Sequence, residues 1–168
     1  MTDKWRSLLT AMRSLSRDKR EGEYNVAELK VIVFQLKDEE YAIPVQQVRS
    51  IEKIQHITRV PRVPKYVKGV INLRGVVTPI IDLRMRFGLE EAEFSDHTRV
   101  IIVALDDMEV GLIVDAANDV VDISTEAIEP PPEVVDTTTA EYINGVVKIG
   151  KRLFILLNLE KVLKTEKG

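Results

Sequence analysis

Short apolar runs rich in valine and isoleucine recur along most of this chain. These two residue types supply 38 of the 168 residues, and they gather in runs such as 31–34, 76–77, 100–103 and 154–157. Glycine, proline, aspartate or asparagine bounds the runs, and β-branched side chains in short bounded runs are typical of buried strands. The pattern therefore predicts a β structure for the middle and the end of the chain.

The first twenty residues have a different spacing of apolar side chains. Trp5, Leu8, Leu9, Met12 and Leu15 recur at helical spacing, and the basic residues fall largely outside this apolar stripe. This spacing predicts one amphipathic helix, and the polar stretch 16–28 that follows it indicates a linker. The predicted organisation is an N-terminal amphipathic helix and linker over 1–28, followed by a β domain over 29–164.

An internal duplication is the most informative feature of the β domain. At an offset of 69 residues, segment 34–43 aligns with 103–112, and both have the pattern of a strand, an acidic turn and a strand. At an offset of 76 residues, segment 66–87 aligns with 142–163. We therefore predict two repeats, about 29–90 and about 98–164, each with four or five short strands. Repeats this small bury little apolar surface alone, so we expect them to pack against each other.

The ends of the repeats and the change of offset predict local structure. Asp82 and Asn158 each stand before a short segment of helical pattern, where a side-chain oxygen can cap a helix. Gly88 is expected to end the first of these helices. The seven extra residues of the second repeat fall around 129–133 and 137–139. They indicate a loop insertion, because proline lacks the amide donor that a central strand requires.

Composition and charge narrow the classes of function. Apolar residues make up 45% and charged residues 30%, which favours a folded domain with a solvated surface. The net charge of -3 argues against nucleic acid as the main partner, because phosphate binding requires a basic face. The absence of cysteine excludes disulfides and cysteine-based metal sites, and it fits a reducing compartment. No apolar run approaches the roughly 20 residues that span a bilayer, so we expect a cytoplasmic protein without direct membrane insertion.

Candidate catalytic groups are few and scattered. His56 and His97 lie in different halves without metal-binding spacing. Segment 95–97, Ser-Asp-His, is favoured as a turn, because neighbours on a chain rarely meet as a catalytic triad. The carboxylates of 106–109 fit a solvated hairpin tip, and no nucleotide-binding or acyl-transfer loop occurs. The sequence therefore predicts no enzyme, no metal site and no cofactor.

Positions where the two repeats differ are free of a shared packing role and point to binding. Arg74 precedes Gly75 in the first repeat only, and its guanidinium suits a carboxylate or carbonyl of a partner. The alternative is a surface arginine in an intramolecular ion pair. A polar set interleaved with Val48 and Ile51 suits a partly apolar groove with a polar rim, or else an edge strand protected by charges. This set consists of Gln47, Arg49, Ser50 and Glu52. A solvated loop is favoured over a phosphate site for the basic segment that contains Arg59, Pro61, Arg62, Pro64, Lys65 and Lys68.

Segment 66–88, YVKGVINLRGVVTPIIDLRMRFG, closely resembles the signature of the CheW family of bacterial chemotaxis coupling proteins. Segments 40–44, 111–115 and 142–146 match as well, so the resemblance covers about residues 30–164. It implies an all-β fold with short helices, in which two interlocked five-stranded SH3-like β-barrels pack on a shared core. It also implies a non-catalytic cytoplasmic adaptor at receptor arrays on the inner face of the membrane. The implied partners are the regulatory domain of the histidine kinase CheA and the cytoplasmic hairpin tip of methyl-accepting chemotaxis receptors.

The same resemblance implies a receptor groove between the two barrels. A receptor helix would lay its apolar stripe into this groove, while the kinase would use barrel-end loops and exposed strands. The N-terminal helix and linker are longer than the short lead usual in this family, so the resemblance assigns them no role. The groove residues that it implies are Val48, Arg49, Ser50, Ile51 and Glu52, with Asn72, Arg74 and Gly75 shaping the groove.

Overall fold

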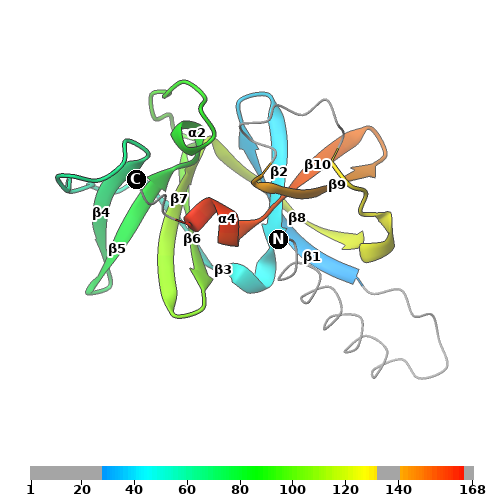
Figure 1. Ribbon diagram of the computed structural model, residues 1–168, viewed down its shortest axis with the longest axis horizontal. Helices are drawn as coiled ribbons and strands as arrows, with labels where there is room; N and C mark the ends of the chain where they lie inside the picture. Colours follow the sequence, from blue (N-terminus) through cyan, green and yellow to red (C-terminus); the bar gives the residue numbers. More distant parts are fainter. Residues whose placement is uncertain (1–27, 132–140, 165–168) are drawn as a thin grey trace.

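The computed structural model describes residues 28–131 and 141–164, and its architecture is mostly β (Figure 1). Two five-stranded sheets are present. The first has the order β8 (Ala116–Ser124), β1 (Glu28–Leu36), β2 (Glu39–Pro44), β10 (Arg152–Leu157), β9 (Ile143–Ile149). The second has the order β3 (Val48–Lys53), β6 (Arg99–Leu105), β7 (Met108–Val114), β5 (Val76–Asp82), β4 (Val67–Leu73).

The helices of the described chain are short, as the sequence predicts. Two are α-helices, α2 (Leu83–Arg86) and α4 (Leu159–Leu163), and two are 3₁₀ turns, η1 (Val45–Gln47) and η2 (Thr125–Ala127). The predicted N-terminal amphipathic helix and most of its linker lie outside the described residues. The limits predicted for the two repeats remain predictions.

Each sheet combines strands of both predicted repeats. The first sheet joins β1 and β2 to β8, β9 and β10, and the second joins β6 and β7 to β3, β4 and β5. Two parallel pairs connect the repeats within the sheets, β2 with β10 and β5 with β7. The two strand orders become identical when each strand is replaced by its counterpart in the other repeat. The repeats are therefore interlocked, because neither sheet is complete without strands from both.

Three apolar clusters follow from the alternation of side chains along the strands. Leu29 and Val31 of β1 point into a core enclosed by the first sheet, whereas Ile32 joins a larger cluster between the two sheets. In β6, Ile102 belongs to the core of the second sheet and Ile101 to the cluster between the sheets. Each central strand thus buries both faces, which explains why its sequence is a continuous apolar run.

Neither sheet closes into a barrel through continuous strand pairing. In the second sheet, the connection from β3 to β4 makes a single bridge in which Thr58 and Val70 exchange two backbone hydrogen bonds of 2.8 Å. Glu129 and Val146 make the equivalent bridge in the first sheet. The predicted SH3-like barrels are therefore not confirmed, because one bridge rather than a ladder spans the gap between the edge strands.

The predicted helix caps are confirmed in both repeats. The Asp82 carboxylate accepts from the backbone N–H of Arg84 at 3.0 Å, and the Asn158 side chain accepts from that of Lys161 at 3.1 Å. In addition, the backbone N–H of Asp82 donates to the Tyr66 carbonyl, and that of Asn158 donates to the Tyr142 carbonyl, each at 2.8 Å. Burial raises the pKa of the Asp82 carboxyl, although the backbone donors of α2 act against this rise.

Arg86, at the end of α2, connects the two repeats. Its side chain is buried, and its guanidinium donates to the carbonyls of Val162 at 2.9 Å and Lys164 at 2.6 Å, at the end of α4. It also lies over the rings of Tyr66 and Tyr142, at 4.3 and 5.1 Å from their centroids. The cation thus satisfies carbonyls that the end of a helix leaves without partners.

An ion pair between Arg84 and Asp115 fixes the start of α2. Arg84 contacts Asp115 through two nitrogens, with Nη2 at 2.6 Å and Nε at 2.9 Å from its oxygens. The backbone N–H of Lys37, in the β1–β2 turn, donates to the same carboxylate at 2.8 Å. Burial acts to raise the pKa of Asp115, but the Arg84 and Lys37 donors outweigh it, and the pKa is lowered.

Candidate functional site

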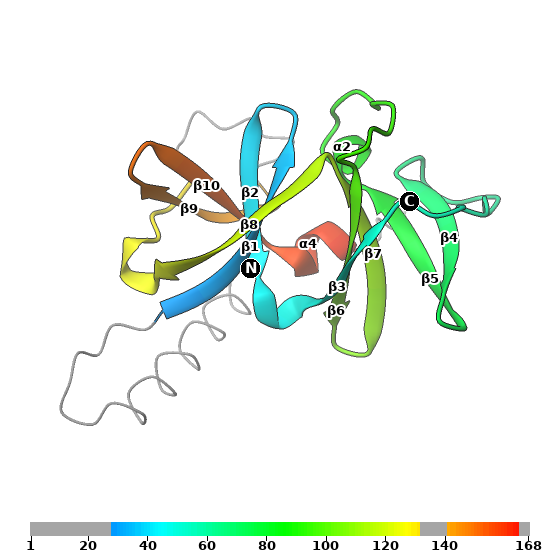
Figure 2. The same ribbon diagram turned by 180° about the vertical axis from the view of Figure 1, so that it is seen from behind.

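Strand β3 carries five of the eight predicted site residues and forms an edge of the second sheet, beside β6 (Figure 2). Its side chains alternate: Val48, Ser50 and Glu52 are half-buried, whereas Arg49 and Ile51 are exposed. Ile51 exposes 41% of its surface, which is unusual for a large apolar side chain in a strand. The five residues therefore divide between two faces of one strand and do not line a single wall.

The hairpin of β4 and β5 carries the other three predicted residues, Asn72 at the end of β4 and Arg74 and Gly75 in the turn. Leu73 pairs with Val76 across it, so Arg74 and Gly75 form a two-residue turn. Both have positive φ, 51° and 85°, as a type I′ hairpin turn requires. The Asn72 side chain accepts from the backbone N–H of Gly75 at 2.9 Å. This left-handed conformation is unusual for arginine.

An ion pair between Glu52 and Arg74 brings these two parts of the predicted site together. The Arg74 Nη2 atom lies 3.3 Å from the Glu52 Oε2 atom, although β3 and β4 are opposite edges of the sheet. The Arg74 side chain remains 70% exposed and that of Glu52 20% exposed. The intramolecular ion pair considered for Arg74 therefore exists. A pair this exposed contributes about 0–1 kcal/mol to stability, so the guanidinium remains available to a partner.

The charged neighbours of Ile51 also agree with the edge-strand alternative. Arg49 lies 3.6 Å from Glu109 of β7 in an exposed ion pair, and Lys53 at the end of the strand is exposed. Charges on an unpaired edge discourage pairing with another strand. Both interpretations of β3 thus fit the geometry, and they differ only in whether Ile51 meets a partner.

The sequence missed the exposed apolar side chains at the start of β5. The run Val76–Val77 was expected to be buried, yet these residues are 55% and 65% exposed. The expectation is wrong because this end of the strand projects beyond the core, which begins at Thr78. Val77 alternates onto the same face as Ile81, which packs between the two sheets. The counterparts of Ile51 and Val77 in the second repeat, Val120 and Leu153, are exposed too.

Histidine and carboxylate side chains are the groups that the sequence offered as candidate metal ligands or catalysts. Within 28–131 and 141–164, no three histidine, aspartate or glutamate side chains cluster as metal ligands. Segment 95–97 is a turn, in which the Ser95 hydroxyl accepts from the backbone N–H of His97 at 3.1 Å. The same described residues form no helix with the length and apolarity of a membrane span.

Comparison with known proteins identifies a family and several relatives. The family model described as CheW-like domain matches residues 30–167. The chain is 53% identical over 137 residues to the chemotaxis protein CheW of Bacillus subtilis (strain 168), and the alignment covers 82% of this chain and 88% of that relative. It is 35% identical over 167 residues to the chemotaxis protein CheW of Helicobacter pylori (strain ATCC 700392 / 26695), with 99% of both chains covered. The second alignment therefore includes the N-terminal segment.

A solved structure supports the same comparison. The scaffolding protein TtCheW from Thermoanaerobacter tengcongensis superimposes with a TM-score of 0.75 at 36% sequence identity. The match covers 82% of this chain and 93% of that protein. The two-sheet architecture is therefore shared over nearly the whole length of the known structure.

Proposed function

This chain belongs to the CheW-like domain family, and on that premise we propose that it is a non-catalytic adaptor in chemotaxis signalling. Its partners are the regulatory domain of the histidine kinase CheA and the cytoplasmic hairpin tip of methyl-accepting chemotaxis receptors. These partners place it on the cytoplasmic side of the receptor array. The name of the TtCheW relative, a scaffolding protein, supports an assembly role rather than a catalytic one.

The exposed face of β3 carries the proposal for the receptor. Ile51 offers an accessible apolar side chain between Arg49 and Lys53, and the ion pair of Glu52 with Arg74 lies at the border of this face. An amphipathic receptor helix can bury its apolar stripe against Ile51 and Val77 while its polar side chains reach the surrounding charges. Arg74 is suited to a carboxylate of the receptor, because its guanidinium is exposed and held by a rigid turn.

The kinase requires a surface that the receptor leaves free. The second repeat offers exposed apolar side chains at positions equivalent to those of the receptor face, Val120 on β8 and Leu153 on β10. Because the two sheets have the same strand order, these residues occupy a corresponding surface of the first sheet. We assign the kinase to this second surface, so that one rigid domain holds both partners.

Titration of the purified chain with each partner tests the adaptor. A receptor hairpin fragment and a CheA regulatory domain should each bind, and the three components should form a ternary complex on a sizing column. Arg74→Glu should weaken receptor binding by at least about tenfold, because reversal of an interfacial charge costs more than its removal. The melting temperature should change little, since the Glu52 pair is exposed.

Lys148→Glu is the matched control, because this exposed lysine lies on β9 of the other sheet. It should leave receptor affinity within twofold. No binding of either partner at tens of micromolar would defeat the adaptor proposal. A large loss of stability in Arg74→Glu, with unchanged receptor affinity, would show instead that Arg74 has only its intramolecular role.

A further inference from the structure

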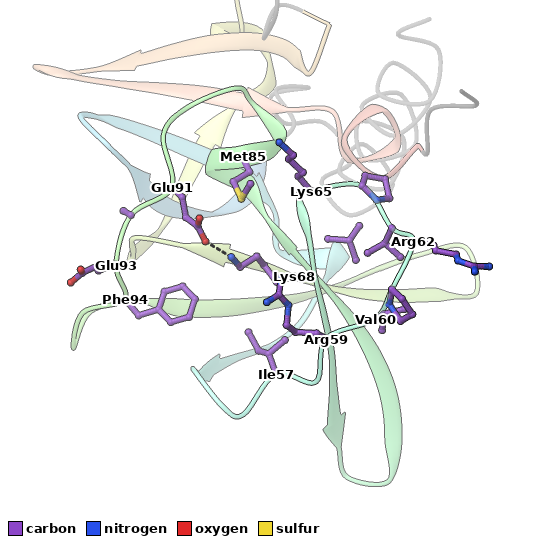
Figure 3. A pocket seen from close by; sticks show the side chains of 15 residues that line it. Ile57, Arg59, Val60, Arg62, Lys65, Lys68, Met85, Glu91, Glu93 and Phe94 are labelled. Carbon is purple, nitrogen blue, oxygen red and sulfur yellow. Dashed lines mark hydrogen bonds and ion pairs between the residues drawn. The ribbon is translucent and has the colours of Figure 1, made fainter.

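A groove separate from the predicted receptor face lies at the end of the second sheet (Figure 3). Its lining comes from the β3–β4 connection, the start of β4, α2 and the segment after α2. None of the eight predicted site residues lines it. Val60, Val63 and Phe94 contribute apolar surface to it and are 38%, 37% and 44% exposed. Apolar side chains around a hollow are typical of a surface that receives a ligand or a partner.

The charge of this groove opposes the charge of the whole chain. The chain has a net charge of -3, yet residues 53–81 contain six lysines and arginines and no carboxylate. Arg59, Arg62, Lys65 and Lys68 line the groove, and the carboxylates of Glu91 and Glu93 on the opposite wall reduce its positive charge without cancelling it. Lys68 pairs with Glu91 from the opposite wall, as the dashed line in Figure 3 shows. The other three cations make no ion pair within the described part of the chain.

The fold of the module does not require two of these cations, Lys65 and Lys68. In the second repeat, Glu141 occupies the position of Lys65 and Asn144 occupies that of Lys68. The backbone around them is nevertheless the same, since Tyr66 and Tyr142 accept equivalent hydrogen bonds from Asp82 and Asn158. These two side chains differ between the repeats although the backbone does not. Neither packing nor hydrogen bonding therefore dictates their identity, which leaves them available for binding.

The groove is also held in shape. The bridge between Thr58 and Val70 anchors the loop, and the backbone N–H of Val67 donates to the Pro64 carbonyl at 3.0 Å. Two prolines, Pro61 and Pro64, restrict the backbone between these anchors. A rigid loop loses little backbone entropy on binding, so only the side chains of its exposed cations remain to be ordered by a partner.

We infer that this groove binds an acidic peptide segment of another protein, one in which carboxylates flank a bulky apolar side chain. The apolar side chain enters the hollow beside Phe94, and the carboxylates reach Arg59, Arg62 and Lys65. A peptide is favoured over an anionic lipid surface because the apolar residues line a hollow and do not form a protruding face. The inference does not rest on the proposed receptor or kinase, because the groove shares no residue with the receptor face.

Fluorescence anisotropy with the full chain tests the inference. The probe is a labelled peptide in which glutamates surround a leucine–phenylalanine pair, and it should bind in the micromolar range at low salt and more weakly at high salt. Replacement of its glutamates by glutamine should weaken binding at least tenfold. The double variant Arg59→Glu, Lys65→Glu should do the same, whereas Phe94→Ser should weaken binding at least threefold.

The double variant Lys148→Glu, Lys151→Glu is the matched control, since it makes the same change of charge at exposed positions of the β9–β10 hairpin in the other sheet. It should leave the affinity within twofold, and circular dichroism should confirm that both double variants are folded. Equal binding of the glutamine peptide, or equal affinity in the Arg59, Lys65 variant, would overturn the inference. Binding to phosphatidylserine vesicles that depends on Arg59 and Lys65, without binding of the peptide, would overturn it in favour of a membrane surface.

Discussion

Replacement of Arg86 by methionine should destabilise the protein far more than an ordinary arginine substitution. The side chain makes two short hydrogen bonds to the carbonyls of Val162 and Lys164 and a longer one of 3.4 Å to that of Lys161. Hydrogen bonds from a charged donor each contribute about 1.5–3 kcal/mol, so the two short ones together contribute about 3–6 kcal/mol. Methionine fills much of the volume but leaves these carbonyls without a donor.

Two further terms modify this estimate. The contacts of the guanidinium with the Tyr66 and Tyr142 rings add roughly 0.5–2 kcal/mol. In the methionine variant, folding no longer has to desolvate a cation, and this gain offsets several kcal/mol of the lost hydrogen-bond and ring-contact energy. We therefore expect a net loss of about 3 kcal/mol in the free energy of unfolding. For a domain of this size that loss lowers the melting temperature by about 6–12 °C.

Urea unfolding followed by far-UV circular dichroism measures this loss. Arg99→Met is the matched control, because Arg99 also donates twice to carbonyls at 2.8 Å, but those of its near neighbours Asp96 and Thr98. Its loss should stay below about 1 kcal/mol, in the ordinary range for a hydrogen bond near the surface. A loss below about 1 kcal/mol for Arg86→Met, or the same loss for both variants, would refute the idea that Arg86 stabilises the contact between α2 and α4.

Three other outcomes follow from local contacts. Asp82→Asn should keep or slightly raise stability at pH 7, whereas Asp82→Ala should cost about 1 kcal/mol; burial raises the folded pKa of Asp82, so protonated Asp82 contributes stability below the unfolded pKa, and the protein loses this contribution as pH rises through the folded pKa. Thermal melts at pH 4 and 7 compare the variants. The pKa of Asp115 is lowered in the folded protein. Its pair with Arg84 therefore stabilises the fold above the unfolded pKa, and this stabilisation is lost as pH falls through the folded pKa. Arg84→Met should lower the free energy of unfolding by about 1–2 kcal/mol at pH 7 and by less near pH 3, as measured in urea titrations. Gly69→Ala should cost about 3 kcal/mol or more in stability, because its Cβ would lie 2.1 Å from the Thr58 carbonyl oxygen. The control is Gly88→Ala, whose Cβ would meet no atom within 4 Å and which should show only the smaller cost of positive φ. Similar losses of stability in both variants would contradict this account.

The duplication made much of the fold predictable. The offset of 76 places β4 over β9 residue for residue, and the caps at Asp82 and Asn158 appear where the pattern puts them. Sequence could not reveal the buried role of Arg86, because an arginine in a short polar helix is usually solvated. Its counterpart, Val162, gives no hint either, since the carbonyl of that residue is the group that Arg86 contacts.

The candidate site was only partly accessible to sequence reasoning. The run 48–52 suggested one groove wall, but the alternation of a strand directs its side chains to two faces. The pair of Glu52 with Arg74 joins opposite edges of one sheet, and nothing in a linear pattern specifies how far a sheet curls. The basic segment 59–68 was expected to be a solvated loop, and its groove depends on Phe94 and Met85 from elsewhere in the chain.

The exchange of strands between the sheets explains why two similar surfaces can have different partners. Within each sheet, the central strands bury both faces and must remain apolar, so change is confined to edge strands, turns and loops. The positions of Ile51 and Val120 keep an apolar side chain in both repeats, whereas the turn that holds Arg74 in the first repeat holds Gly150 in the second. Because the parallel pairs β2–β10 and β5–β7 connect the repeats, the two surfaces are held on one rigid core. Partners bound to them are then fixed in relative position by the interlocked sheets, and their specificity rests on the few exposed residues that differ between the repeats.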